Sequence, residues 1–298
     1  MLFYYRLHYI DVSGSFQGRE CMTVIGIDIG GSTTKIVGIR EGFLMKPIQV
    51  TATDPVTSLY GAFGRYMSEN GLDLKDVSEI RLTGVGASHF KGDIYGIKTE
   101  KTNEFQCIGL GGLHLTRLDS AIIVSMGTGT AFVRADGCNI SHIGGTGVGG
   151  GTLLGLSSKL LQIRNFASIC DLAQGGNLDN VDLAVGDISQ DSSEKLTRKT
   201  TASNFGKISD YAGKEDIALG LINMVFQTVG MMAAFACRSV GVNDVVLCGN
   251  LTTIPDALSF FDVIHELHGV NFHLPQHAEY ATALGAALSG FDGKVYSE

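Results

Sequence analysis

Tryptophan is absent from the 298 residues, proline occurs four times, and the six cysteines include no C-x-x-C pair. No cluster of cysteine and histidine has the spacing of a zinc site, so we expect free thiols in a reducing, cytoplasmic compartment and no zinc. No stretch approaches the roughly 20 apolar residues of a membrane-spanning helix, and no membrane association is expected. The lack of paired cysteines argues against a disulfide-stabilised secreted protein, and the lack of a long apolar stretch argues against an integral membrane protein.

Positive charge is also scarce, with 22 lysines and arginines against 30 acidic residues and a net charge of -8. A chain with this balance has no basic face that could neutralise a phosphodiester backbone, so nucleic acid is not an expected partner. Hydrophobic residues make up 44% of the sequence. This share and the chain length are sufficient for one large domain or two ordinary domains with their own cores.

The first 21 residues are rich in aromatic side chains but lack a basic start followed by an uninterrupted apolar core. A secretory signal is therefore not predicted. Met22 stands directly before the strand-like run TVIGIDIGG. We therefore expect an N-terminal extension at 1–21 outside the fold, an N-terminal lobe at 22–116 and a C-terminal lobe at 117–298.

Glycine is abundant, with 40 residues, and it gathers where apolar strands are predicted to end. The first such stretch is GIDIGGSTTK, residues 26–35, in which a strand runs into Asp28, Gly30 and Gly31. Glycines without Cβ atoms let a phosphate approach the main-chain amides, and neighbouring side chains add donors or charge: Ser32, Thr33, Thr34 and Lys35. Asp28 suits a hydrated Mg²⁺. Taken alone, such a turn is more often only a tight connection between strands.

Three further glycine turns strengthen the phosphate interpretation. They are SMGTGT at 125–130, GGTGVGGGT at 144–152 before a predicted helix, and LCGN at 247–250. At the helix start, unpaired N–H groups would favour an anion. The strand-and-turn pattern recurs about one hundred residues after its first occurrence, a separation that fits a domain-sized unit. With alternating strand and helix patterns, this predicts an α/β protein with duplicated domains and a nucleotide cleft between them.

Secondary structure between these turns follows from periodicity and capping residues. Helices are predicted at 54–71, 103–117, 149–163, 165–176, 214–240, from about 255, and at 280–290, with a strand at 43–52. The segment 175–213 is polar and is predicted to be irregular. The apolar helix at 214–240 suggests either a homodimer interface or an ordinary core helix.

At these residues the sequence resembles the acetate and sugar kinase, heat-shock chaperone and actin superfamily, which has actin-like (ribonuclease H-like) domains. More closely, over residues 23–290, it is similar to type II pantothenate kinase through NEFQCIGLGG, SMGTGT, HIGGTGVGGGTLLGL and TASNFG. The resemblance implies ATP-dependent phosphorylation of the primary hydroxyl of pantothenate to 4'-phosphopantothenate, the first step of coenzyme A biosynthesis. It also implies Mg²⁺ as cofactor, a homodimer, and coenzyme A or an acyl-coenzyme A as a candidate regulator.

In this resemblance Glu104 corresponds to the base that receives the proton of the substrate hydroxyl. Nucleotide contacts are implied at Asp28, Gly30, Gly31, Ser32, Thr33, Thr34, Lys35, Gly127, Thr128, Gly129, Gly150, Gly151, Thr152, Leu153, Leu154, Phe166 and Asn250. Asp28 is also the implied metal ligand, and Thr128 and His142 are the implied substrate contacts. Phosphoryl transfer needs mainly positioning and charge neutralisation, so one carboxylate completes the set. The alternative for Glu104 is an exposed carboxylate that interacts with the dipole of a helix start.

Two positions depart from the family pattern. His142 stands where the family commonly has an arginine, and a neutral imidazole cannot replace a permanent bidentate cation, so substrate identity or affinity is open. Arg134 is a candidate replacement, although a strand arginine with a solvated head group is the alternative. Asn250 replaces a residue that often carries a hydroxyl, which leaves the detail of the adenosine contact open.

Three other functions remain open from the sequence. An ATP-driven activator of a radical dehydratase would need grouped cysteines for an iron-sulfur cluster, and Cys107 and Cys138 do not look paired. A sensor of nucleotide or acyl-coenzyme A without catalysis is consistent with His142. A sugar kinase of the same superfamily is the nearest enzymatic alternative.

Overall fold

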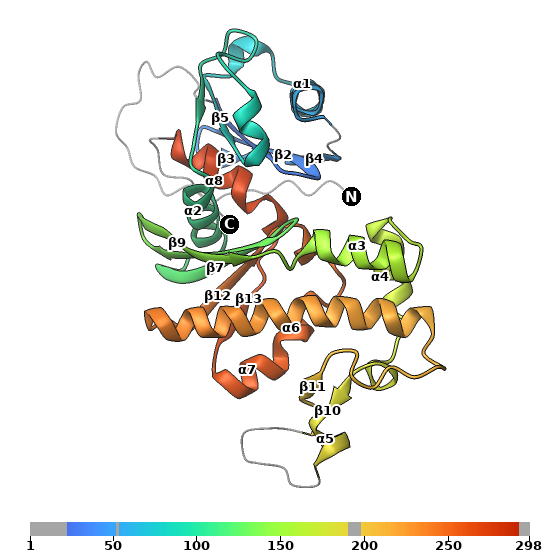
Figure 1. The fold of residues 1–298 in the computed structure, drawn as a ribbon. Helices are drawn as coiled ribbons and strands as arrows, with labels where there is room; N and C mark the ends of the chain where they lie inside the picture. The colour runs from blue at the N-terminus through green and yellow to red at the C-terminus, as the bar shows by residue number, and fades with distance from the viewer. Residues whose placement is uncertain (1–22, 52–53, 190–197, 292–298) are drawn as a thin grey trace. The chain divides into compact units, whose positions relative to one another are not determined.

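The computed structural model describes residues 23–51, 54–189 and 198–291 (Figure 1). The chain divides into two compact units. Unit 1 comprises the residues up to Asp119, the segment Ala135–Ser141 and the C-terminal part from Gln276, whereas unit 2 comprises Ser120–Arg134 and His142–Pro275. The first boundary falls close to the expected one, but the C-terminal helix groups with the N-terminal part of the chain because it packs there. The predicted extension at 1–21 lies outside the described residues.

Unit 1 is built on a six-stranded sheet of order β3-β2-β1-β5-β6, with β4 also pairing with β2. The central β1 is antiparallel to β2 and parallel to β5. The strands are β1 (Thr23–Ile29), β2 (Thr33–Arg40), β3 (Phe43–Leu44), β4 (Ile48–Thr51), β5 (Glu79–Thr83) and β6 (Thr99–Lys101). The single strand expected at 43–52 is thus divided in two, with Pro47, which has no N–H to donate, directly before β4.

Alternation along β1 sorts its side chains onto two faces of the sheet. One face meets α1 (Pro55–Asn70), and three isoleucines of the strand are buried there: Ile25, Ile27 and Ile29. α1 begins at the side-chain cap of Asp54 and ends at Gly71, as the sequence predicted. Gly26 and Asp28 therefore lie on the opposite face of β1.

The opposite face is covered by α8 (Ala281–Ser289), which also packs against α2 (Glu104–Thr116). Small residues let the main chains approach closely. A Cβ atom at Gly26 would overlap the main chain of α8, and one at Gly285 of α8 would overlap the carbonyl of Cys107 in α2. Unit 1 is therefore a sheet with α1 on one side and the α2–α8 pair on the other.

The sheet of unit 2 has the order β13-β12-β7-β8-β9. Its strands are β7 (Ser120–Met126), β8 (Thr130–Asp136), β9 (Asn139–Thr146), β12 (Asp244–Cys248) and β13 (Asn271–His273). Counted within each sheet, and leaving β4 aside, both sheets follow the order 3-2-1-4-5, with the fourth strand parallel to the first and to the fifth. This repeated order agrees with the predicted duplication of one α/β domain.

The helices of unit 2 are α3 (Gly150–Leu160), α4 (Phe166–Ala173), α5 (Val185–Ile188), α6 (Lys214–Val240) and α7 (Asp262–His268). The helix expected from about 255 starts only at Asp262, after a 3₁₀ turn at Ala257–Phe261. The expected irregular segment contains α5 and a short antiparallel pair of strands, β10 (Leu183–Ala184) and β11 (Thr201–Ser203).

The long helix α6 extends along unit 2 (Figure 1). By length and composition alone it could cross a membrane. Most of its apolar stretch is nevertheless buried within the protein, and Phe226, Val229 and Ala233 belong to the core of unit 2. This burial is that of a core helix, one of the two alternatives that the sequence left open.

Candidate functional site

Asp28 of β1 and Lys35 of β2 stand opposite each other in the antiparallel pair. Lys35 is only 6% exposed, and Asp28 is partly buried. Burial raises the pKa of the Asp28 carboxyl, and the neighbouring ammonium of Lys35 lowers it by a smaller amount. In the turn between them, the Gly30 amide donates to the carbonyl of Thr33 at 2.9 Å. This end of β1 therefore concentrates charge where water is partly excluded.

Two residues at the end of β5 lie beside Asp28, and the sequence alone predicted no role for either. Thr83 ends β5 in register with Asp28, and its buried hydroxyl lies beside the thiol of Cys107. Gly84 follows with a φ of 85°, and a Cβ atom there would lie 2.5 Å from a carboxylate oxygen of Asp28. Only glycine lets this turn close against the carboxylate. The signal in the sequence was the Thr-Gly pair after the strand-like run SEIRL.

Glu104 is the first residue of α2 and is partly buried. The side chain of Asn103 caps the helix by accepting from the amides of Phe105 at 3.0 Å and Gln106 at 3.2 Å. Burial and, to a smaller extent, the negative charge of Asp28 raise the pKa of the Glu104 carboxyl. The two carboxylates are thus electrostatic neighbours within unit 1. A partly desolvated carboxylate with a raised pKa is a better proton acceptor than the exposed glutamate of the alternative interpretation.

Mg²⁺ suits this pair of carboxylates because a divalent cation offsets the repulsion between them. In the described part of the chain, no group of three or more His, Cys, Asp and Glu side chains is arranged to hold a metal. A magnesium ion at Asp28 would therefore take its remaining ligands from phosphate oxygens and water, as Mg²⁺ commonly does where phosphoryl groups are transferred. Asp28 stays the predicted metal ligand.

In unit 2, the second and third glycine turns hold each other by main-chain hydrogen bonds. The amide of Gly150 donates to the carbonyl of Gly127 at 2.9 Å, and that of Gly151 donates to the carbonyl of Thr128 at 2.8 Å. The expectation of unpaired N–H groups at this helix start is wrong for these two amides, because they close the SMGTGT turn against α3. Thr128 itself is exposed, as contact with a ligand requires.

The fourth glycine turn, LCGN, meets the second at the end of β7. Gly249 follows β12 with a φ of 93°, and a Cβ atom there would lie 2.6 Å from the carbonyl oxygen of Met126. Asn250 starts the next 3₁₀ turn and is partly buried. Three of the four predicted phosphate turns are thus neighbours within unit 2, and the first lies in unit 1.

The other predicted site residues differ in exposure. Leu153 is fully buried in the core of unit 2 and Thr34 is fully buried in unit 1, so their side chains serve packing. Exposed residues are Gly31, Ser32 and His142, and partly exposed ones are Gly30, Thr33, Gly129, Thr152, Leu154 and Phe166. The hydroxyl of Thr152 donates to the carbonyl of Gly147 at 2.9 Å, which further ties the start of α3 to the turn before it.

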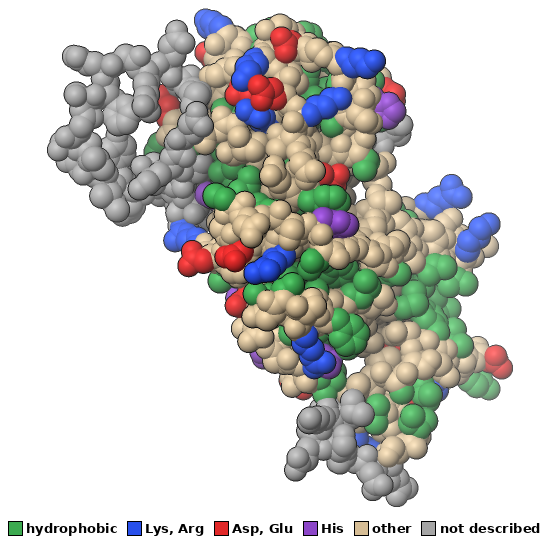
Figure 2. Space-filling view, turned by 60° about the vertical axis from the view of Figure 1, so that its left-hand side comes forward, with side chains coloured by type: hydrophobic (Ala, Val, Ile, Leu, Met, Phe, Trp, Pro, Cys, Tyr) green, Lys and Arg blue, Asp and Glu red, His purple; other side chains and the backbone are tan. Residues whose placement is uncertain are grey.

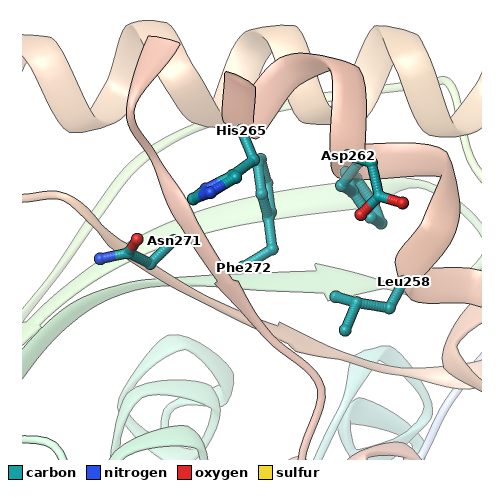
Figure 3. Close-up of a pocket in the computed structure, with 6 residues that line it drawn as sticks. Leu258, Asp262, His265, Asn271 and Phe272 are labelled. Atoms are coloured by element: carbon teal, nitrogen blue, oxygen red, sulfur yellow. The ribbon is translucent and has the colours of Figure 1, made fainter. Parts of the chain in front are cut away.

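A cavity of about 220 Å³ lies between α7 and β13 in unit 2 (Figure 3). It is lined by Leu258, Phe261, Asp262, His265, Asn271 and Phe272. None of the residues predicted from the sequence belongs to this lining. The glycine turns and the cavity are therefore separate features of unit 2.

Charge on the face shown in Figure 2 is mixed, with acidic and basic side chains interspersed among the coloured residues. In unit 1, Arg81 pairs with Glu79 at 2.7 Å and with Glu100 at 2.8 Å. Such paired groups neutralise each other and form no basic surface. This pattern agrees with the acidic composition of the chain.

Comparison with known proteins identifies the family. The Fumble family matches residues 120–289, more than half of the chain. The chain belongs to the Fumble family. It is 27% identical to the type II pantothenate kinase of Staphylococcus saprophyticus, over 88% of this chain and 98% of that protein. It is also 27% identical to the type II pantothenate kinase of Oceanobacillus iheyensis, over 90% of this chain and 100% of that protein. The similarity to type II pantothenate kinases is thus confirmed.

Solved structures confirm the actin-like α/β fold. The activator of the 2-hydroxyisocaproyl-CoA dehydratase from Clostridium difficile, with bound ADPNP, matches with a TM-score of 0.67 and 18% identity, over 91% of this chain and 95% of that one. A ROK family glucokinase from Streptomyces griseus, in complex with glucose and AMPPNP, matches with a TM-score of 0.57 and 13% identity, over 90% and 98% of the two chains. At this level of identity the similarity concerns the fold alone.

Proposed function

We propose that this protein is a cytoplasmic pantothenate kinase, which transfers the terminal phosphoryl group of ATP to the primary hydroxyl of pantothenate in coenzyme A biosynthesis. The observation that carries the proposal is Glu104, a partly buried carboxylate beside Asp28 at the start of α2, in a chain whose named relatives are type II pantothenate kinases along nearly their whole length. Supporting features are the glycine turns that follow strands in both units.

The reaction needs one proton acceptor. The substrate hydroxyl oxygen forms a bond to the γ-phosphorus as the bond from that phosphorus to the β,γ-bridging oxygen breaks, which gives 4'-phosphopantothenate and ADP. The hydroxyl proton passes to the Glu104 carboxylate. Its raised pKa brings the proton affinity of this group closer to neutral pH, where a general base works best.

Binding of ATP is assigned to main-chain amides and hydroxyls. In unit 1 these belong to the turn 30–33 beside Lys35, and in unit 2 to the turn around Thr128 and the start of the 3₁₀ turn at Asn250. Mg²⁺ at Asp28 would neutralise phosphate charge during transfer. The exposed imidazole of His142 is assigned to the substrate carboxylate, where it donates a hydrogen bond in place of a bidentate cation.

A homodimer through α6 is part of the proposal. Met224, Met231 and Phe235 recur on one side of this helix at spacings of seven and four, and Phe235 is 56% exposed. An exposed phenylalanine on a helix whose other apolar side chains are at least partly buried suits a contact with a second copy of the chain. Light scattering coupled to gel filtration would show twice the chain mass, and a monomer mass for the wild-type protein would exclude this interface.

One assay separates the proposed kinase from the other functions. ADP release is measured with and without pantothenate, and phosphopantothenate is identified by mass spectrometry. Release that depends on pantothenate supports the kinase, whereas equal ADP release without it indicates an activator and no release indicates a sensor. The activator is disfavoured because Cys107 is buried whereas Cys138 is exposed, so the two thiols lie in different environments and not at one shared surface. Glucose tested as a second acceptor addresses the sugar kinase alternative.

A further inference from the structure

The segment before Glu104 is tied to two other elements of unit 1. The amide of Thr102 donates to the carbonyl of Leu82 in β5 at 2.8 Å, and its hydroxyl oxygen lies 3.2 Å from that of Ser289, the last residue of α8. Ser289 donates its one hydroxyl hydrogen to the carbonyl of Ala286 at 2.7 Å, so Thr102 must be the donor between the two hydroxyls. α8 therefore accepts a directed hydrogen bond from a residue two positions before Glu104.

The helix α8 also contacts α2 on the other side of Glu104. A Cβ atom at Gly285 would overlap the carbonyl of Cys107, which lies one turn after Glu104. A Cβ atom at Gly111 would overlap the carbonyl of Ala281. The main chains of α2 and α8 are thus in contact at two points along the helices, with no side chain between them. Such contacts transmit a displacement of one helix directly to the other.

The same helix contacts the strand that carries Asp28. A Cβ atom at Gly26 would overlap the carbonyl of Ala283 and the amide of Ala287. Gly26 lies two residues before Asp28 and therefore on the same face of β1. α8 is in main-chain contact with both elements that bear a carboxylate of the site.

We propose that α8 sets the position of Glu104 relative to Asp28, and that Ser289 and Gly285 are positioning residues for phosphoryl transfer. Neither is expected to touch a substrate. Their effect passes through Thr102 and the first turn of α2, and small displacements of a catalytic group are known to be costly for rate. The kinetic part of this inference rests on the proposed function, but the geometric part concerns unit 1 alone.

Ser289→Ala tests the proposal with little change in volume. Loss of the acceptor leaves the Thr102 hydroxyl unpaired and loosens the first turn of α2, so the amides of Phe105 and Gln106, which Asn103 caps, should exchange faster with solvent. This exchange is measured by NMR of the labelled protein without nucleotide. We also expect kcat to fall about tenfold with the KM for ATP unchanged. Ser289→Thr restores the hydroxyl and should restore both values.

Thr116→Val is the matched control, because it removes a hydroxyl hydrogen bond to the carbonyl of Gly112 at the far end of α2, the helix that begins at Glu104. It should leave kcat and the amide exchange of the first turn of α2 unchanged. Gly285→Ala should act in the same direction as Ser289→Ala but more strongly, since the added methyl must push the helices apart. Gly64→Ala in α1, where a Cβ atom meets nothing within 4 Å, controls for glycine replacement in a helix.

The outcomes distinguish this proposal from the proposed function. Unchanged amide exchange in the first turn of α2 and an unchanged kcat in a folded Ser289→Ala variant would overturn the positioning role. Equal effects in Thr116→Val would do the same, because they would indicate general loosening of α2. If the wild-type protein does not phosphorylate pantothenate, the proposed function fails, while the amide exchange of the first turn of α2 still decides whether α8 positions Glu104.

Discussion

The two sheets repeat one strand order but differ in the chemistry of the turn after the first strand. In unit 1, Asp28 is the penultimate residue of β1, and Lys35 stands opposite it on β2. In unit 2, β7 runs into SMGTGT, which has no charged side chain. The comparison teaches that a duplicated fold can keep a turn suited to phosphate in both copies while only one copy carries the acidic and basic groups.

The glycine after the fourth strand shows what the duplication has kept. Gly84 in unit 1 and Gly249 in unit 2 have φ values of 85° and 93°, and both press against the end of the first strand of their own sheet. Each is followed by a 3₁₀ turn. Both glycines meet the carbonyl of the last residue of that strand, Ile29 or Met126, and Gly84 also meets the carboxylate of Asp28. The two units therefore share the backbone conformation of this turn, whereas a charged side chain beside it occurs in unit 1.

The largest expected effect is on kcat, and it should arise from the charged residue Glu104 of unit 1. The neutral side chain of Thr128 in unit 2 should instead affect the binding of ATP. Glu104→Gln removes the proton acceptor and should lower kcat by about 10²–10⁴-fold, with ATP affinity nearly unchanged. Thr128→Val removes a neutral hydroxyl and should act mainly on the KM for ATP. Steady-state kinetics with varied ATP and pantothenate measure both. Full turnover in Glu104→Gln would refute the assignment of the base.

Replacing each of the two equivalent glycines by alanine tests whether both turns depend on the same backbone conformation. Gly84→Ala and Gly249→Ala should each destabilise their unit by about 1–3 kcal/mol, because a non-glycine residue is strained at these φ values. Gly84→Ala should in addition alter the titration of Asp28, which its methyl group would contact. Urea unfolding and carboxyl NMR measure the two effects. Gly71→Ala, at a left-handed helix end with nothing within 4 Å, separates backbone strain from collision.

Most of the fold could be predicted from the sequence because its elements obey local rules. α1 has a capping aspartate, and α6 follows from its apolar periodicity. The placement of α8 in unit 1 could not be predicted, because it depends on contacts of Gly26 and Gly285 with main chains distant in sequence. Glu104 was found by family resemblance, whereas Thr83 and Gly84, which lie beside Asp28, were missed because their role arises from strand register. The pairing of the Gly150 amide depends on tertiary contact as well.

A smaller effect tests the coupling between the two carboxylates of unit 1. Asp28→Asn removes a negative charge that raises the pKa of Glu104, so this pKa should fall. In carboxyl NMR without nucleotide, the Glu104 signal should titrate at lower pH than in the wild type. Asp73→Asn, at an exposed acidic residue of the same unit, should leave it unchanged. An unshifted Glu104 titration in Asp28→Asn would show that burial alone raises the pKa.

The smallest effect concerns stability, and it has opposite signs at two glutamates of unit 1. The folded state raises the pKa of Glu104, so ionisation of this group costs stability as pH rises above its ordinary value of 4.5. The Glu104→Gln variant should therefore be more stable than the wild type at neutral pH, and this difference in stability should disappear in acid.

The pKa of Glu100 is lowered by the hydrogen bond from Lys98 and the charge of Arg81. Glu100→Gln should accordingly lose stability at neutral pH, and this difference should also vanish as Glu100 becomes protonated. Thermal unfolding from about pH 2 to pH 8 covers the protonation of both groups. The same sign at both sites would refute the link between the two environments and stability.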